Sequence, residues 1–383
     1  MKTIRQCVGI DCSKDTLDVA ISFLKEDFNA EVQATEVFKN NDQGFKRLMK
    51  WVKKLYVQEL PCQMVVEATG VYHECLAYAL VKNNMEVAVV LPNKVRNYCR
   101  STDVRTITDK ISAKQIAEFG LGKKLDNWTP PDKMFRQLRT LCRERSQLLH
   151  EKTSISNQKH AYDYSAFPYE GTEKRSKRRT KFLENQITEI EDEIRTILDA
   201  HPAIKEKVEK IGSIKGVGWL TVVTVVAETN GFNLIRNCRQ LVCYAGYDIV
   251  VKDSGTSVRS KPRMSHKGNK HIRAALHFPA LIAVRYNDTI KAFYKRLFER
   301  QKVKMKSYVA VQRKLLTLIY TLWKKDEYYD PAYHNKQSNN HKILEQPIEV
   351  ALTEVDHVPS CDCVNLNAKI KNNFQLNHKI NKT

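Results

Sequence analysis

The sequence predicts an α/β domain at the N-terminus, followed by mostly helical structure. Residues 5–125 alternate strand-like runs with amphipathic helical patterns, residues 131–200 carry long helical periodicity, and the rest is mainly helical. We therefore expect four parts: an α/β domain at 1–125, a helical coiled-coil linker at 126–202, a mostly helical domain at 203–334 and a flexible tail at 335–383.

The first region reads as five strands. They are Cys7–Cys12, Thr16–Phe23, Glu31–Phe38, Met64–Ala68 and Glu86–Leu91. Helical patterns follow the third and fourth strands, in "NNDQGFKRLMKWVKKLY" and "VYHECLAYALVKNN". Three strands with short connections, then alternating helix and strand, predict a mixed sheet with an antiparallel meander on one side. That order is the one used by ribonuclease-H-like folds.

The linker contains an apolar seam. Leu183, Ile187, Ile190, Ile194 and Ile197 step by four, three, four and three residues, with charged residues between them. This is the a/d spacing of a helical hairpin or coiled coil. We expect the seam to join subunits, with packing inside one chain as the alternative.

The helical domain opens with "IKGVGWLTVVTVVAE", in which Gly216 and Gly218 precede an apolar helix. A Gly-x-Gly turn of the helix–hairpin–helix kind presents backbone N–H groups to a phosphate. A tight turn between two helices explains the same residues equally well. The tail beyond this domain is rich in Asn and Lys, which is typical of a flexible segment.

Charge indicates the partner. The chain has 64 Lys and Arg against 43 Asp and Glu, a net charge of +21. Such an excess favours a polyanion, most commonly nucleic acid. An acidic membrane surface is the rival partner, but we find no apolar run long enough to span a bilayer and no signal peptide.

The cysteines indicate a reducing compartment. Most of the ten are scattered through expected strands and helices, which favours reduced thiols in a cytosolic protein. Cys361 and Cys363 form a close pair, but no second CxxC or His pair lies nearby. A polar tail with incidental thiols is therefore favoured over a zinc site.

Acidic residues mark two strand ends. Asp11 in "VGIDCS" and Glu67 in "VVEATG" each end an apolar strand. Side by side they would repel each other unless a cation lay between them, and oxygen ligands suit Mg²⁺ or Mn²⁺. Such sites cleave phosphodiesters. A third acid, Asp109, begins a predicted helix; each acid alone also fits a strand-end residue or a helix cap.

A basic segment, "DSGTSVRSKPRMSHKGNKHIR", carries the other candidate residues. Ser254 precedes a glycine and is followed by six cations, namely Arg259, Lys261, Arg263, Lys267, Lys270 and Arg273. A serine among cations can attack a phosphodiester, with arginine stabilising the developing charge. From the residues alone, a basic loop that touches phosphates is the favoured interpretation.

Four motifs in this order resemble the DEDD-type transposases of bacterial insertion sequences, the recombinases guided by a bridge RNA. They are "VGIDCSKDTLDVAI", "VVEATGVYHECLAYAL", "LPNKVRNYCRS…TDKISAKQIAEF" and "DSGTSVRSKPRMSHKGNKHIRAAL". The resemblance runs from about residue 6 to about residue 334. Each motif alone is modest, but four in order are specific.

The resemblance implies a RuvC-like domain of ribonuclease-H fold, a coiled-coil linker and a C-terminal transposase domain. The family's metal-binding acids fall on Asp11, Glu67 and Asp109, and its nucleophilic serine falls on Ser254. It also implies a Mg²⁺ or Mn²⁺ cofactor, double-stranded DNA and a structured guide RNA as partners, and a homo-oligomer, a dimer or tetramer, with composite sites. The setting implied is the bacterial cytoplasm, at the nucleoid.

The sequence departs from the family pattern at one acid. Ser112 stands three residues after Asp109, where the family has a fourth Asp, and Ile107 replaces a usual lysine. A catalytically impaired, nucleic-acid-binding relative is therefore the alternative function. A third hypothesis, a phosphotransferase of the actin and sugar-kinase type, lacks the second glycine-rich phosphate loop that it needs.

Overall fold

The computed structural model describes residues 2–102, 104, 106, 108–233, 235–251, 253–255 and 257–331, without the side chains of Val258 and Arg259. The chain divides into residues 1–329 and residues 330–383. The expected tail, the pair Cys361 and Cys363, and Ile107 lie outside the described residues.

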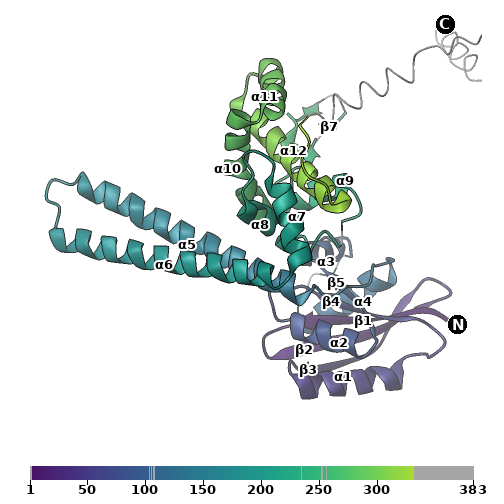
Figure 1. The fold of residues 1–383 in the computed structure, drawn as a ribbon. Helices are drawn as coiled ribbons and strands as arrows, with labels where there is room; N and C mark the ends of the chain where they lie inside the picture. The colour runs from purple at the N-terminus through teal and green to yellow at the C-terminus, as the bar shows by residue number, and fades with distance from the viewer. Residues whose placement is uncertain are drawn as a thin grey trace, which may run out of the picture. The chain divides into compact units, whose positions relative to one another are not determined.

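The N-terminal domain is built on one five-stranded sheet (Figure 1). The strands are β1 (Thr3–Cys12), β2 (Thr16–Lys25), β3 (Ala30–Lys39), β4 (Cys62–Glu67) and β5 (Glu86–Val90), in the order β3-β2-β1-β4-β5. β1, β2 and β3 form an antiparallel meander, whereas β4 runs parallel to β1 and to β5. The five expected strands and the ribonuclease-H-like order are confirmed.

Helices cover both faces of this sheet, because its central strands are apolar on both sides. α1 (Asp42–Leu55) and α2 (Glu74–Lys82) share one core with Val8, Ile10 and Val66. α3 (Pro92–Cys99) and α4 (Asp109–Leu121) share the opposite core with Cys7 and Val65. Neighbouring residues of one strand thus face different layers.

The approach of α4 to the sheet depends on glycine. A Cβ on Gly9 would lie 2.3 Å from the carbonyl oxygen of Ala113, and a Cβ on Gly120 would lie 2.4 Å from Sγ of Cys7. Small residues therefore let the helix backbone rest directly on β1. This fixes the start of α4 relative to the end of that strand.

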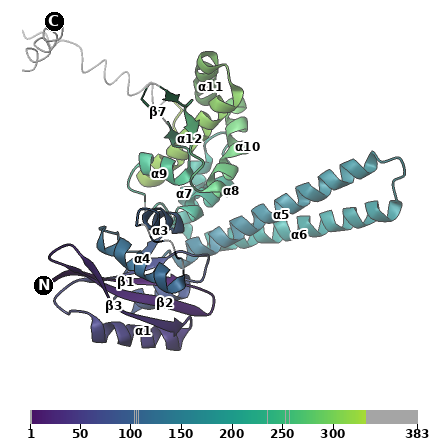
Figure 2. The ribbon, with the colours of Figure 1, turned by 180° about the vertical axis from the view of Figure 1, so that it is seen from behind.

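Two long helices follow, α5 (Lys133–Asp163) and α6 (Glu170–Asp199), and they pack side by side as a hairpin (Figures 1 and 2). Arg145 pairs with Glu191 at 2.7 Å, and Lys152 pairs with Glu184 at 2.8 Å. The seam residues Leu183, Ile187, Ile190 and Ile194 are already buried in the single chain. The expectation that the seam joins subunits is therefore wrong; packing inside one chain, the alternative, accounts for it.

The C-terminal part of the described chain is mainly helical. Its helices are α7 (Pro202–Gly212), α8 (Trp219–Glu228), α9 (Cys238–Ala245), α10 (Lys270–Tyr286), α11 (Asp288–Gln301) and α12 (Lys304–Lys325). α8 and α12 supply much of the core, to which the first turns of α5 also contribute. Four two-residue strands, β6 (Ile249–Val250), β7 (Asp253–Ser254), β8 (Val258–Arg259) and β9 (Arg263–Met264), lie between α9 and α10.

The Gly216 turn has a structural explanation. Gly216 has a φ of +99°, and a Cβ there would lie 2.6 Å from the backbone nitrogen of Ala283 in α10. The turn thus packs against a helix of its own domain. Gly218 is exposed and precedes α8, with no neighbouring atom where a Cβ would stand.

Within the described residues, no helix is long and apolar enough to cross a membrane. The eight cysteines of this part of the chain are all free thiols.

Candidate active site

Asp11 and Glu67 end two neighbouring strands. β1 and β4 run parallel with Ile10 opposite Val66, so the next residue of each strand is one of these acids. Both side chains are half-buried. Asp109 is the first residue of α4, the helix that lies on β1.

The carboxylates act on one another. The pKa of Asp11 is raised to about 6, first by burial and then by the neighbouring charges of Glu67, Asp109 and Asp18. Burial also raises the pKa of Glu67, against a hydrogen bond from Thr69 and the charge of Arg96, which lower it. A concentration of negative charge that disfavours ionisation in this way is the electrostatic setting that a cation relieves.

Asp18 is the acid that sequence reasoning missed. It lies directly opposite Asp11 in the β1–β2 register. Its pKa is raised by burial and then by the charge of Asp109. The available signal was the short β1–β2 turn, because a tight hairpin makes residues 11 and 18 partners once both strand ends are known.

In this structure the carboxylates of the described residues are not close enough together to coordinate a metal ion. Among the residues that the structure describes, no three His, Cys, Asp or Glu side chains are grouped closely enough to hold an ion as they stand. The donor set still fits a hard divalent cation, since it consists of carboxylate oxygens at one end of the sheet. Asp11, Glu67 and Asp109 would hold the ion, and their side chains would have to close on it.

Ser112 lies in the first turns of α4, half-buried, and its backbone N–H bonds to the Thr108 carbonyl at 2.8 Å. It is therefore on the helix that also carries Asp109. A hydroxyl is a weak, neutral ligand beside carboxylates.

Ser254 stands in a small, nested β-hairpin. β6 pairs with β9 and, further along, β7 pairs with β8, with Ser254 opposite Val258. Gly255 has a φ of +55°, so the turn after Ser254 uses the left-handed region that glycine tolerates. Ser254 is exposed. The base of the hairpin is tied by a hydrogen bond from the Ser265 hydroxyl to the Asp248 carboxylate.

The cations of the basic segment divide into two groups. Lys261, Arg263, Lys267 and Lys270 are exposed. Arg273 is half-buried and donates to the Ala245 carbonyl at the end of α9, at 2.7 Å, so its guanidinium serves the fold. The Arg259 side chain lies outside the described structure.

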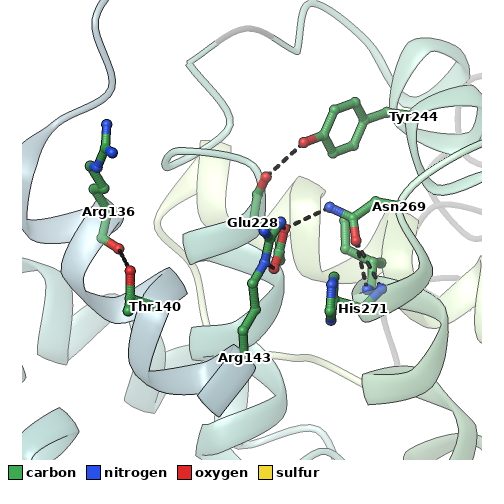
Figure 3. A network of polar contacts seen from close by, with 8 residues as sticks. Arg136, Thr140, Arg143, Glu228, Tyr244, Asn269 and His271 are labelled. Atoms are coloured by element: carbon green, nitrogen blue, oxygen red, sulfur yellow. Dashed lines mark hydrogen bonds and ion pairs between the residues drawn. The ribbon is translucent and has the colours of Figure 1, made fainter. Parts of the chain in front are cut away.

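A buried carboxylate anchors the end of this segment. Glu228 of α8 receives hydrogen bonds from Arg143 of α5, at 2.7 and 2.8 Å, and from the Asn269 amide at 2.7 Å (Figure 3). The Asn269 oxygen in turn accepts from the backbone N–H groups of His271 and Ile272 and caps α10. The network thus fixes the point where the basic segment enters α10.

A ribonuclease-H-type sheet with carboxylates at the ends of its central strands, in one chain with a basic helical part, is an arrangement that suits an enzyme acting on nucleic acid. The chain matches a DEDD transposase family of the IS110 type over residues 8–168. It matches a second transposase family, IS116/IS110/IS902, over residues 208–295. The chain belongs to the IS110-type DEDD transposases, which are DNA transposases and recombinases.

The chain matches two curated relatives over nearly their whole length. The chain is 26% identical over 329 residues to the pilin gene-inverting protein of Moraxella bovis and, equally, to that of Moraxella lacunata. The match spans 85% of this chain and 98% of each relative.

Among solved structures, RuvC of T. thermophilus in complex with a Holliday junction substrate is 15% identical, with a TM-score of 0.22. That match covers 30% of this chain and 90% of RuvC. At so low a TM-score the fold assignment rests on the strand order, not on this likeness.

Proposed function

We propose that this chain cuts and rejoins DNA strands through a serine nucleophile, Ser254, assisted by an acidic divalent-metal site at Asp11, Glu67 and Asp109. The observation that carries the proposal is the meeting of half-buried carboxylates at the ends of β1 and β4, where burial and mutual repulsion raise the pKa of Asp11 to about 6. Family membership supports it, because enzymes with this acidic site use divalent metal ions.

In the proposed reaction the Ser254 oxygen attacks a backbone phosphorus. The Oγ–P bond forms, the bond from phosphorus to the leaving sugar oxygen breaks, and the product is a phosphoserine plus a DNA hydroxyl. Attack of another strand's hydroxyl on the phosphoserine rejoins DNA and releases the serine. The names of the two Moraxella relatives, gene-inverting proteins, support a reaction in which the cut ends are joined again.

The chain's residues have distinct roles in this scheme. Ser254 needs a group that accepts its proton, because an alcohol is a poor nucleophile near neutral pH. A divalent ion held by the acids would stabilise charge on the transferred phosphoryl group. Exposed Lys261 and Arg263 would hold the DNA backbone beside the serine, together with Arg259. Gly218 offers a further backbone N–H for phosphate, whereas Gly216 is used in packing.

The proposal includes a structured guide RNA, double-stranded DNA as substrate, Mg²⁺ or Mn²⁺ as the ion, and a homo-oligomer. An oligomer would let Ser254 of one subunit meet the acids of another. A chromosomal substrate would place the enzyme in the bacterial cytoplasm, at the nucleoid. The domain divisions 1–125, 126–202 and 203–334 are part of the same proposal.

One observation favours a second function. Ser112 on α4 supplies no carboxylate where the family has its fourth acid. The second candidate is therefore a catalytically impaired relative that binds nucleic acid without cutting it.

The test is to trap a protein–DNA adduct under denaturing conditions. The native chain is compared with Ser254→Ala and with the matched control Ser257→Ala, which alters another exposed serine of the same hairpin. We expect the adduct with the native chain and the control, and none with Ser254→Ala. An adduct that persists in Ser254→Ala removes the serine from this role. An adduct that forms only after Ser112→Asp establishes the impaired relative.

A further inference from the structure

The distal part of the α5–α6 hairpin carries exposed aromatic rings that the fold does not use. Tyr164 is 80% exposed, Phe167 93%, Tyr169 66% and Phe182 62%. Soluble proteins rarely leave several large rings in water within one short segment unless the rings meet a partner. The core of the hairpin lies elsewhere, in the Leu183–Ile194 seam.

Two of these rings are held in place. The Tyr164 ring lies against His160 with the ring centroids 4.8 Å apart. The Tyr169 ring lies over Gly171, where a Cβ would come within 2.6 Å of it, and the Tyr169 backbone N–H bonds to the Tyr162 hydroxyl. Rings held in this way lose little conformational entropy when something stacks on them.

Cations surround the rings. The first three turns of α6 carry six exposed cations, namely Lys174, Arg175, Lys177, Arg178, Arg179 and Lys181. Lys174 and Lys177 are paired with Glu170 and Glu173 one turn earlier. No ion pair within the described structure engages Arg178, Arg179 or Lys181.

Tyr169, Phe182 and the arginines between them form one strip along the start of α6, and Tyr164 and Phe167 belong to the segment that leads into it. Residues 175, 178, 179 and 182 share one face, because they are three and four residues apart on a helix. Arg175 and the Tyr169 ring both border Gly171, so the strip continues into the loop before the helix. Arg179 and Phe182 also line a hollow of about 320 Å³, together with Ser154 and Gln158 of α5.

We propose that this distal hairpin surface, formed by Tyr164, Phe167, Tyr169, Arg175, Arg178, Arg179 and Phe182, binds the unpaired nucleotides of an RNA loop. Aromatic faces and guanidinium planes stack on bases, while the remaining cations neutralise phosphates. Duplex DNA keeps its base faces inside the stack, so exposed rings give it nothing to bind. A second copy of the chain is disfavoured, because two such basic surfaces repel each other.

This inference rests on the proposed function only in taking RNA, rather than single-stranded DNA, as the source of unpaired nucleotides. It adds a place on the molecule and a mode of binding.

The test measures binding of the full-length protein to a labelled RNA stem–loop by fluorescence anisotropy. The variants are Phe167→Ala with Phe182→Ala, and Arg178→Gln with Arg179→Gln. The control is Phe278→Ala, which removes another ring, 70% exposed, from α10. The competitors are the same sequence as single-stranded DNA and as a full RNA duplex.

We expect a loss of roughly tenfold in affinity for each ring removed, equivalent to about 1.4 kcal/mol, and no loss in the control. If the ring variants bind the RNA stem–loop as tightly as the native chain does, the proposal that this surface binds RNA is wrong. Equal competition by single-stranded DNA overturns the commitment to RNA, and a change in mass by light scattering with unchanged binding assigns the surface to self-association. If the native chain binds no RNA at all, it is the RNA part of the proposed function that fails, whereas the Ser254 adduct test is unaffected by any of these results.

Discussion

At the scale of single residues, Asp11 and Glu67 combine adjacent strand ends with half-burial, whereas Asp109 is exposed at the start of α4. The ionised form of Asp11 is strongly disfavoured: its pKa is raised to about 6, first by burial and then by the charges of Glu67, Asp109 and Asp18. A bound divalent cation would reverse this repulsion, since an opposite charge favours the ionised carboxylate. Metal affinity should therefore follow the number of carboxylates that surround the site.

Restoring the missing acid should strengthen metal binding. Ser112→Asp adds a charged oxygen ligand on the helix that carries Asp109. We expect Ser112→Asp to have a lower dissociation constant for Mn²⁺ than the native chain, measured by isothermal titration calorimetry. Ser154→Asp, an exposed change in the hairpin, is the control and should have no effect. Unchanged Mn²⁺ affinity in Ser112→Asp would show that position 112 does not face the ion.

Asp18 allows the opposite test. Because it pairs with Asp11 across β1 and β2, Asp18→Asn should weaken Mn²⁺ binding while keeping the side chain's shape. The exposed Asp15→Asn in the same β1–β2 turn is the matched control. If Asp18→Asn binds Mn²⁺ as tightly as the native chain does, Asp18 does not contribute to metal binding.

Sequence alone singled out Asp11 and Glu67, because an apolar strand run that ends in an acid is visible as a local pattern. Asp109 begins a helix, and only the family resemblance connected it with the other two acids. Sequence could not identify Asp18, since that position becomes significant only through the strand register. Glu228 was also missed, inside the apolar run "VVTVVAETN". Its partner Arg143 is 85 residues away, and no local pattern connects them.

At the scale of elements, the Glu228 network joins α5, α8 and the start of α10. Burial raises the pKa of Glu228, but hydrogen bonds from Arg143 and Asn269 and the charge of Arg143 outweigh it, so the pKa ends below its usual value. The same ion pair raises the pKa of Arg143. The carboxylate thus stabilises the folded chain while it is ionised.

The sign of the pH dependence follows. A carboxyl with a lowered folded pKa stabilises the protein above its ordinary value of 4.5, and that stability is lost as pH falls through the folded pKa. Glu228→Gln should lower the free energy of unfolding at pH 7 by roughly 3 kcal/mol. It should also make the free energy of unfolding depend less on pH below pH 4.5. Denaturation monitored by circular dichroism at several pH values measures both effects.

Glu206→Gln serves as the control for this prediction. Glu206 pairs with Lys210 on the surface, and its side chain is 63% exposed. Exposed pairs contribute about 0–1 kcal/mol, so this variant should be almost neutral. If the two variants behave alike, the Glu228 network does not stabilise the chain.

The hairpin seam shows which part of an element sequence can predict. The a/d spacing indicated a buried stripe correctly, but it could not say which helix covers it. In the structure α5 covers it, with ion pairs from Arg145 and Lys152 across the hairpin. A seam of this kind looks the same in sequence whether its partner helix is in the same chain or another.

Changing the seam should therefore unfold the hairpin. Ile194 is fully buried, so Ile190→Lys with Ile194→Lys places two charges in an apolar interface. We expect faster hydrogen exchange in α5 and α6. Lys substitution at exposed Thr188 and Glu193 on the same helix is the control. A clean change from oligomer to monomer with unchanged exchange would restore the seam as a subunit interface.

At the scale of the whole molecule, the excess of cations is distributed by role. The chain carries a net charge of +21. Arg143 and Arg273 hold the fold, whereas Lys261, Arg263, Lys267 and Lys270 remain exposed along the segment that follows Ser254. Net charge alone predicted a polyanionic partner, but only the hydrogen bonds separate the structural cations from those that can meet phosphate.

Duplex DNA binding should accordingly depend steeply on salt, and this segment should supply part of the dependence. Each phosphate contact releases counterions and contributes about −0.9 to the slope of log affinity against log salt. Lys267→Gln with Lys270→Gln should make the slope shallower by about 0.9 for each lysine that contacts a phosphate. Fluorescence anisotropy with a labelled duplex over a series of salt concentrations measures the slope.

The control must remove the same charge elsewhere. Lys46→Gln with Lys50→Gln does so on the exposed face of α1, and it lowers the net charge equally. If the net charge attracts DNA without specific contacts, both double variants will weaken binding by the same amount. Their slopes of log affinity against log salt will then be equal. If the basic segment touches DNA, only the Lys267 and Lys270 variant changes the slope, because counterion release counts phosphates contacted and not charges carried. Identical slopes in both variants and the native chain would place Lys267 and Lys270 off the DNA-binding face.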